Sequence, residues 1–303
     1  MQYATKVEAI IGKTPLIDLT ALGTGSARIL GKYEATNPGG SVKDRIARAM
    51  LDAAEKDGRL APGGTVIEPT SGNTGVGLAM LCAARGYRMI LVMPDTMSVE
   101  RRRLAASYGA EIVLTPGAEG MKGAVAKADQ LAAETPGSII AGQFVNPANP
   151  QAHYETTGPE VWDATEGAVD VLIAGVGTGG TVSGTGRFLK EHKATVEVVA
   201  VEPAESPVLS GGAPGKHRIQ GIGAGFVPDT YDATVVDTVK TVASDDAVAT
   251  KKRLAAELGV LVGISAGAAT AAALALDATG DYAGKTIVAI LPDTGERYLS
   301  LEA

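Results

Sequence analysis

The chain has 303 residues, 45% of them hydrophobic, and a net charge of −7, which is typical of a globular protein with room for two domains. The acidic balance argues against nucleic acid or a membrane surface as a partner, and one cysteine excludes an internal disulfide. Three scattered histidines offer no metal-ligand spacing. No signal peptide and no membrane span is evident, so we expect a cytoplasmic protein.

Apolar runs alternate with amphipathic segments along the whole chain. In its first half we expect a short helical segment at 7–11, strands at 16–20, 28–33, 65–68, 89–93, 111–115 and 138–141, and helices at 41–57, 76–85, 99–108 and 120–134. In its second half we expect strands at 169–174, 196–201, 234–238 and 286–291, and helices at 182–191, 244–258 and 267–277. Strands that alternate with long helices predict an α/β fold of parallel β-α-β units.

The composition changes at residues 143–150, where two Asn-Pro steps argue against a regular helix. We interpret this segment as the crossing between two lobes. The expected division is a small, mobile lobe of residues 35–145 and a large lobe of residues 1–34 plus 146–303. Each lobe should hold a mostly parallel sheet wrapped by helices, with a cleft at the carboxyl ends of the strands.

The stretch Asn37–Arg45 joins a Pro-Gly-Gly turn to an amphipathic segment. The turn cannot be helical, so the helix should begin at Ser41, with Ser41 and Asp44 as a capping box. Lys43 would then lie in the first helical turn, where the macrodipole disfavours a cation by roughly 0.3–1 kcal/mol. A neutral amine at Lys43 can form a Schiff base with a carbonyl cofactor, whereas the alternative is a solvated lysine.

The loop Thr70–Gly75 follows a short apolar strand and opens a helix. Its hydroxyl groups and backbone N–H groups predict an anion site. Because the loop lacks the lysine of a nucleotide-triphosphate loop, a carboxylate is the better ligand, with the amide of Asn73 as a directed donor. The alternative is an ordinary capped turn.

A third loop, residues 175–181, matches the pattern G-x-G-x-x-G, and Glu202 ends the next strand. Taken alone, this pattern supports a dinucleotide site and an NAD-dependent oxidoreductase. The hydroxyls of Thr178 and Thr181 suit a terminal phosphate monoester instead. A fourth candidate, Ser265, is expected to end a buried strand and to face the same cleft.

Eight segments together match one family: 11–16, 37–45, 69–75, 143–149, 153–160, 175–180, 217–226 and 291–298. On these motifs the chain resembles the fold-type II, pyridoxal-phosphate-dependent β-replacement enzymes, whose fold is like that of the tryptophan synthase β chain. Among them it is similar to the A-type cysteine synthases, or O-acetylserine sulfhydrylases. The resemblance covers nearly the whole chain.

The resemblance implies a role for each candidate residue. Lys43 is the catalytic residue and binds pyridoxal 5'-phosphate covalently, Asn73 bonds its ring oxygen, and Ser265 meets its pyridine nitrogen. The cofactor phosphate is held by Gly177, Thr178, Gly179, Gly180 and Thr181. The substrate is held by Thr70, Ser71, Asn73, Thr74 and Gln143, with Gly221 and the following residues to 223 on its amino side.

The implied reaction belongs to cysteine biosynthesis: O-acetylserine and sulfide give cysteine and acetate through an aminoacrylate. Lys43 acts as the general base. The resemblance also implies a homodimer and leaves room for binding of the C-terminal tail of serine acetyltransferase. An oxidoreductase, or a catalytically silent binder of serine acetyltransferase, stays as an alternative, and the sulfur donor is open.

Overall fold

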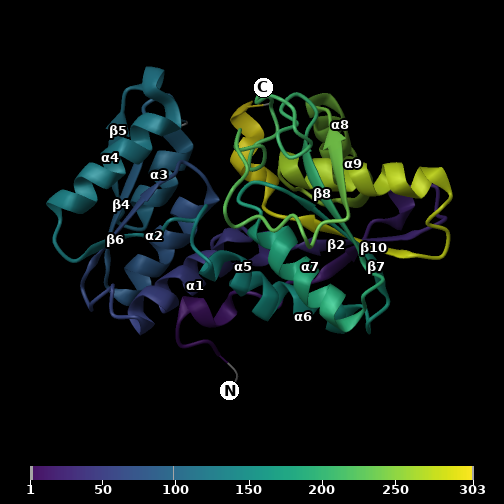
Figure 1. Cartoon of the computed structure of the whole chain (residues 1–303), viewed down its shortest axis with the longest axis horizontal. Coiled ribbons are helices and arrows are strands. Elements are labelled where there is room, and N and C mark those ends of the chain that lie inside the picture. The colour runs from purple at the N-terminus through teal and green to yellow at the C-terminus, as the bar shows by residue number, and fades with distance from the viewer. Residues whose placement is uncertain (1–2, 98, 302–303) are drawn as a thin grey trace. The chain divides into compact units, whose positions relative to one another are not determined.

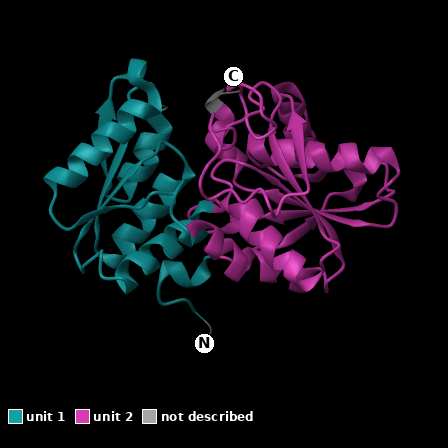
Figure 2. Ribbon diagram, viewed as in Figure 1, with its two compact units in different colours: residues 1–11, 43–148 teal, residues 12–42, 149–303 magenta. Residues whose placement is uncertain are grey.

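The computed structural model describes residues 3–97 and 99–301, which form two compact units (Figure 2). Unit 1 comprises Met1–Ile11 and Lys43–Ala148, and unit 2 comprises Gly12–Val42 and Asn149–Ala303. Each unit has its own sheet and its own covering helices, as the alternation of strands and helices predicts.

Unit 1 is built on a four-stranded parallel sheet in the order β5-β4-β3-β6. Its strands are β3 (Thr65–Pro69), β4 (Arg88–Pro94), β5 (Glu111–Thr115) and β6 (Ser138–Ile140). Ile67 in β3 lies opposite Ile90 in β4 and Ile140 in β6. Because these central positions are apolar, the strands of unit 1 can be covered by helices.

The helices of unit 1 are η1 (Val7–Ile10), α1 (Lys43–Lys56), α2 (Asn73–Arg85), α3 (Val99–Ser107), η4 (Gly117–Glu119) and α4 (Gly120–Glu134). Ala124 and Ala128 of α4 are fully buried against Ile67, Ile90 and Val92 of the sheet. α2 is buried along most of its length and packs against α1. The two helices bring the segments around residues 43 and 73 into one unit.

Unit 2 is built on a six-stranded sheet in the order β1-β2-β10-β7-β8-β9. Its strands are β1 (Leu16–Asp18), β2 (Arg28–Tyr33), β7 (Val169–Gly175), β8 (Glu197–Pro203), β9 (Thr238–Val242) and β10 (Thr286–Leu291). β1 is antiparallel to β2, and all other neighbours are parallel. A long parallel sheet requires helices on both of its faces.

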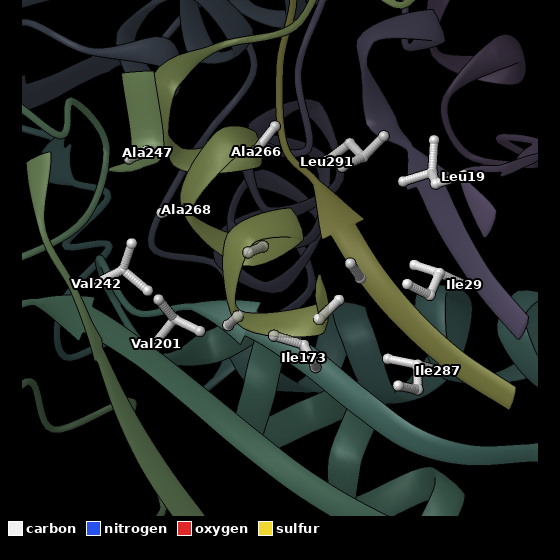
Figure 3. Close-up of a cluster of buried hydrophobic side chains, with 14 of the residues drawn as sticks. Leu19, Ile29, Ile173, Val201, Val242, Ala247, Ala266, Ala268, Ile287 and Leu291 are labelled. Atoms are coloured by element: carbon white, nitrogen blue, oxygen red, sulfur yellow. The ribbon is translucent and has the colours of Figure 1, made fainter. Parts of the chain in front are cut away.

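The helical segments of unit 2 are η2 (Thr20–Leu22), η3 (Glu34–Thr36), α5 (Ala148–Ala152), the π-helix η5 (His153–Thr157), α6 (Gly158–Ala164), α7 (Gly180–His192), α8 (Ser244–Leu258), α9 (Ile264–Thr279) and η6 (Gly295–Leu301). α8 and α9 cover one face of the sheet, and α6 and α7 cover the other (Figure 1). Ile287 and Leu291 of β10 point to the α9 face and belong to the same buried cluster as Ala266 and Ala268 of α9 (Figure 3). Val288 and Ile290 point to the opposite face.

The strongest sequence patterns predict their elements to the residue. β2, β5, β10, α4 and α8 have the expected bounds. Each of these segments is a clear apolar run or an amphipathic helix ended by a glycine or a turn residue.

The strand expected at 234–238 is wrong, because β9 is Thr238–Val242. The carboxylate of Asp232 accepts the N–H of Thr234 at 2.9 Å and its hydroxyl at 2.6 Å, which makes a local turn there. Asp237 then accepts the N–H of Val198 at 2.8 Å through its side chain, so the ladder with β8 starts one residue later.

The helix expected from Ser41 begins at Lys43, two residues later, and the capping box of Ser41 with Asp44 stays a prediction. Ser41 forms an antiparallel bridge with Asp293, and the N–H of Val42 donates to the carbonyl oxygen of Pro292 at 2.8 Å. These contacts hold both residues out of the helix. The Pro-Gly-Gly turn is confirmed, with the N–H of Gly40 bonded to the carbonyl oxygen of Asn37 at 2.7 Å.

The sequence predicts that residues 143–150 contain no regular helix. This prediction is wrong for residues 148–150, because α5 begins at Ala148. Pro150 lies in the first turn of α5, where a proline needs no N–H partner.

The division into units differs from the expected one in three places, of which the smallest is that residues 146–148 belong to unit 1. Residues 35–42 belong to unit 2, because Asn37 Oδ1 accepts the N–H of Gly12 at 2.8 Å and Val42 bonds to Pro292. The described residues up to Ile11 belong to unit 1, where Glu8 pairs with Arg85 at 2.6 Å. Within the part of the chain that the structure describes, no helix is long and apolar enough to cross a membrane.

Candidate active site

Unit 2 forms a tight loop between the end of β7 and the start of α7. A Cβ atom on Gly177 would lie 2.4 Å from the carbonyl oxygen of Gly221, and one on Gly180 would lie 1.9 Å from Oδ1 of Asn149. Gly179 has a φ of +85°. Only glycine satisfies these positions, and the loop leads into the first turn of α7. N–H groups in such a turn have no partner within the helix, so this loop is suited to an anion.

The two hydroxyls of this loop are each fixed by a buried side chain. Thr178 Oγ1 accepts a hydrogen bond from Nδ2 of Asn149 at 2.9 Å, and Thr230 Oγ1 donates to the carbonyl oxygen of Thr178 at 2.6 Å. Thr181 Oγ1 lies 3.2 Å from Nε2 of His153. The sequence pattern assigned no site role to Asn149 or Thr230, since neither is part of the glycine motif.

Ser265 lies beside the same loop. It is the second residue of α9, so the expectation that it ends a strand is wrong: Val262 forms only an isolated bridge with Thr294 before the helix begins. A Cβ atom on Gly221, whose φ is +93°, would lie 3.7 Å from Oγ of Ser265. The structure thus brings Gly177, Gly221 and Ser265 into one continuous set.

The segment after Gly221 is held from two sides. The N–H of Gly223 donates to the carbonyl oxygen of Val176 at 3.0 Å, and the carbonyl oxygen of Gly223 lies 3.0 Å from Nε2 of His217. This fixes residues 221–223 against the end of β7.

Unit 1 presents a second helix N-terminus that is rich in polar groups. α2 begins at Asn73, three residues earlier than expected, so Asn73 and Thr74 lie in its first turn. Thr70 Oγ1 accepts the N–H of Gly72 at 3.2 Å, and Thr74 Oγ1 donates to Oε1 of Gln143 at 2.6 Å. Thr74 and Gln143 are far apart in the sequence, and the fold of unit 1 brings them together.

Lys43 is the first residue of α1 in the same unit, and both Lys43 and Ser71 are half-buried. α1 and α2 approach closely, because a Cβ atom on Gly77 of α2 would lie 3.1 Å from Oδ1 of Asp44. Lys43 and the loop before α2 are therefore carried by two helices of one packed pair.

Glu68 was missed by the sequence motifs. It is 1% exposed near the end of β3, and its carboxylate accepts the N–H of Gly142 at 2.8 Å and that of Gln143 at 3.3 Å. Burial raises the pKa of Glu68 to about 7. The hydrogen bonds from the two N–H groups lower this pKa, but their effect is smaller than that of burial. A charge at the end of an otherwise apolar strand was the signal in the sequence.

Glu202 does not have the environment of a ribose-binding acid. It is 2% exposed, and its carboxylate accepts hydrogen bonds from the N–H of Leu209 at 2.7 Å and from the N–H and hydroxyl of Ser210 at 3.0 and 2.6 Å. Both oxygens thus hold the loop that follows β8. This removes the acidic residue on which the dinucleotide interpretation depends.

The comparison with known families gives a single assignment. The family of pyridoxal-phosphate dependent enzymes matches residues 7–293. The chain belongs to this family. Membership agrees with the two-unit α/β architecture and contradicts the oxidoreductase alternative.

Named members of this family resemble the chain over nearly its whole length. A cysteine synthase of Staphylococcus aureus is 52% identical over 296 residues, which is 97% of this chain and 95% of the relative. The crystal structure of a cysteine synthase from Entamoeba histolytica has a TM-score of 0.96 and 44% identity, covering 99% of this chain and 90% of that one. An O-ureido-L-serine synthase structure has a TM-score of 0.96 and 45% identity, covering 99% and 94%.

The residues present fit the cofactor of this family. The cradle at Gly177 and Gly180 leaves no room for a side chain, and the N-terminus of α7 with the hydroxyls of Thr178 and Thr181 is a donor set for a phosphate. Ser265 adds a neutral hydroxyl, which can bond a ring nitrogen without a charge.

Proposed function

We propose that this pyridoxal-phosphate-dependent enzyme is a cysteine synthase, which converts O-acetylserine and sulfide into cysteine and acetate by β-replacement. The 52% identity to a cysteine synthase over nearly the full length supports this proposal. The structural observation that carries it is the contact of the Gly177 loop, Gly221 and Ser265 in unit 2. A phosphate cradle next to a neutral hydroxyl suits elimination and addition better than reactions that need a protonated pyridine ring.

In this proposal pyridoxal 5'-phosphate supplies an electron sink that allows the substrate α-proton to be removed. Gly177, Gly179 and Gly180, with Thr178 and Thr181, hold its phosphate through N–H and hydroxyl donors. Ser265 bonds its ring nitrogen, Asn73 bonds its ring oxygen, and Lys43 binds its aldehyde covalently.

The N-terminus of α2 is proposed to hold the carboxylate of the amino-acid substrate. Thr70, Ser71 and Thr74 offer hydroxyls there, and Gln143 offers its amide. Asn73 is shared between cofactor and substrate, and Gly221 lines the amino side. An anion at this end of a helix is favoured by the macrodipole.

Lys43 is proposed to take the α-proton of the substrate with its side-chain amine and to act as general base. Loss of acetate from the β-carbon and addition of sulfide at the same carbon then complete the exchange. The lysine returns the proton and regains its bond to the cofactor when cysteine leaves.

The experiment compares the reaction of O-acetylserine with two nucleophiles, sulfide and hydroxyurea, catalysed by the purified protein saturated with cofactor. With O-acetylserine and sulfide we expect a visible absorption band of bound cofactor and cysteine as the product, measured by mass spectrometry. Hydroxyurea, whose addition would give O-ureidoserine, should react much more slowly. A colourless protein that forms no cysteine would refute the proposal, and faster reaction with hydroxyurea would assign it to the other activity.

We also propose, from the family resemblance, that the enzyme is a cytoplasmic homodimer and binds the C-terminal tail of serine acetyltransferase. The single cysteine supports a reducing compartment. Sedimentation of the holoenzyme, alone and with a synthetic tail peptide, tests the assembly. A holoenzyme that sediments as a monomer and does not bind the peptide would refute this part of the proposal.

A further inference from the structure

Glu68 stands outside the proposed machinery, yet it connects two parts of it. The parallel ladder between β3 and β6 ends at the pair Ile67 and Ile140, and the N–H of Ala141 still bonds to the carbonyl oxygen of Ile67 at 3.2 Å. After this point the chain turns at Gly142, whose φ is +71°. The backbone carbonyl groups of β3 therefore do not accept the next two N–H groups, those of Gly142 and Gln143.

The side chain of Glu68 takes over from the backbone. One carboxylate oxygen accepts the N–H of Gly142 at 2.8 Å, and the other accepts that of Gln143 at 3.3 Å. A single carboxylate thus fixes two successive peptide groups where the sheet hydrogen bonds stop. Burial of its charge is costly, which makes a purely incidental position unfavourable.

From Gln143 the connection continues to the N-terminus of α2. Oε1 of Gln143 accepts the hydroxyl hydrogen of Thr74 at 2.6 Å, and Gln143 and Thr74 are 6% and 2% exposed. This bond fixes which end of the Gln143 amide faces Thr74, so the NH₂ end faces away from it. Glu68 also lies two residues before Thr70 in the chain. It is therefore connected to the Thr70–Gly75 loop through the backbone and to Gln143 through its side chain.

We propose that Glu68 is a positioning residue that sets the place of Gln143 against Thr74 and so determines affinity for the carboxylate of the amino-acid substrate. This inference rests on the proposed function of Gln143 and Thr74. Glu68 does not touch substrate in the proposal but acts through the backbone N–H groups of Gly142 and Gln143.

The test compares two amines that differ in one group. L-Serine carries the carboxylate, and 2-aminoethanol has the same amine and hydroxyl without it. The dissociation constants of both are measured with the wild-type holoenzyme and with Glu68→Gln at about pH 8, where Glu68 is mostly charged. In Glu68→Gln one N–H group faces the NH₂ of the new amide, so it loses its acceptor. We expect L-serine to bind roughly tenfold more weakly and 2-aminoethanol to bind unchanged.

A double-mutant cycle separates positioning from general loss of structure. In a Gln143→Ala background, Glu68→Gln should change L-serine binding by less than about twofold, because the residue through which it acts is gone. Hydrogen exchange of the peptide 141–146 should be faster in Glu68→Gln. Glu111→Gln, which removes an exposed carboxylate from β5 of the same unit, is the matched control and should change neither.

Equal weakening of L-serine and 2-aminoethanol, or full additivity with Gln143→Ala, would overturn the inference. If Glu68→Gln does not fold, Glu68→Asp replaces it, because its carboxylate keeps the charge but ends about 1.5 Å short; the same selective loss is expected, and an unselective one overturns the inference. The proposed function is tested separately: it fails if the wild type forms no cysteine. That outcome would not change the hydrogen-exchange result for the peptide 141–146.

Discussion

The buried carboxyl of Glu68 should make the stability of the protein fall as the pH rises. Its pKa is raised from 4.5 to about 7, with burial as the largest cause. Between these two values the folded state binds more protons than the unfolded state. The contribution of Glu68 is therefore complete below about pH 4.5 and is lost as the pH passes through about 7. Glu68→Gln has no proton to lose and should remove this dependence.

The size of the effect follows from the two pKa values. A rise of about 2.5 pH units corresponds to about 3 kcal/mol over the whole range. Between about pH 5.5 and about pH 8.5 the two titration curves leave about 2 kcal/mol of this difference. The window stays above the isoelectric point of 5.1, where proteins lose solubility.

The assay is urea unfolding of wild type, Glu68→Gln and Glu111→Gln with a fixed excess of cofactor. From about pH 5.5 to about pH 8.5 the wild type should lose about 2 kcal/mol relative to Glu68→Gln. Its bond to Arg88 lowers the pKa of Glu111, so Glu111→Gln should run parallel to the wild type. Parallel curves for the wild type and Glu68→Gln would show that burial does not hold a proton on Glu68, and would refute the reasoning.

The remaining predictions concern the proposed machinery. Lys43→Ala should abolish turnover, and once the loss of cofactor is discounted its stability should change by under about 1 kcal/mol, because alanine favours the start of α1. Borohydride reduction and mass spectrometry should find the cofactor on the Lys43 peptide of wild type and on no peptide of the variant. Gly177→Ala places a Cβ atom 2.4 Å from the carbonyl oxygen of Gly221, so pyridoxal phosphate should bind at least about tenfold more weakly while pyridoxal binding changes little. Ser265→Asp should still bind cofactor but release acetate more slowly in stopped-flow measurements, and an unchanged rate would contradict the role of its neutral hydroxyl.

Much of the fold could be predicted because local patterns and tertiary packing agree in it. α4 and α8 are amphipathic segments ended by turn residues, and β10 is a continuous apolar run, so their bounds need no knowledge of the rest of the chain. The glycine loop could also be found, since the close approach of Gly177 to Gly221 permits no other residue. The pattern did not reveal which segment approaches it.

The errors lie where a distant segment decides. Ser41 has the residue type that starts a helix, but its backbone bridge to Asp293 places it two residues before the first residue of α1. Asp232 and Asp237 shift β9 by four residues through side-chain bonds that no periodicity reveals. In the sequence, Glu68 interrupts an apolar strand. Its role as an acceptor for the N–H groups of Gly142 and Gln143 follows only from the folded structure.

Four of the candidate residues lie in the first turn of a helix. Lys43 is the first residue of α1, Asn73 the first of α2, Gly180 the first of α7 and Ser265 the second of α9. Helix N-termini present N–H groups and a partial positive charge, so phosphate and carboxylate can be bound without cationic side chains. Among the candidate residues only Lys43 is cationic, which agrees with the proposal that its amine serves covalent and acid–base chemistry. In a chain with a net charge of −7, the proposed backbone sites would attract anions that the surface as a whole repels.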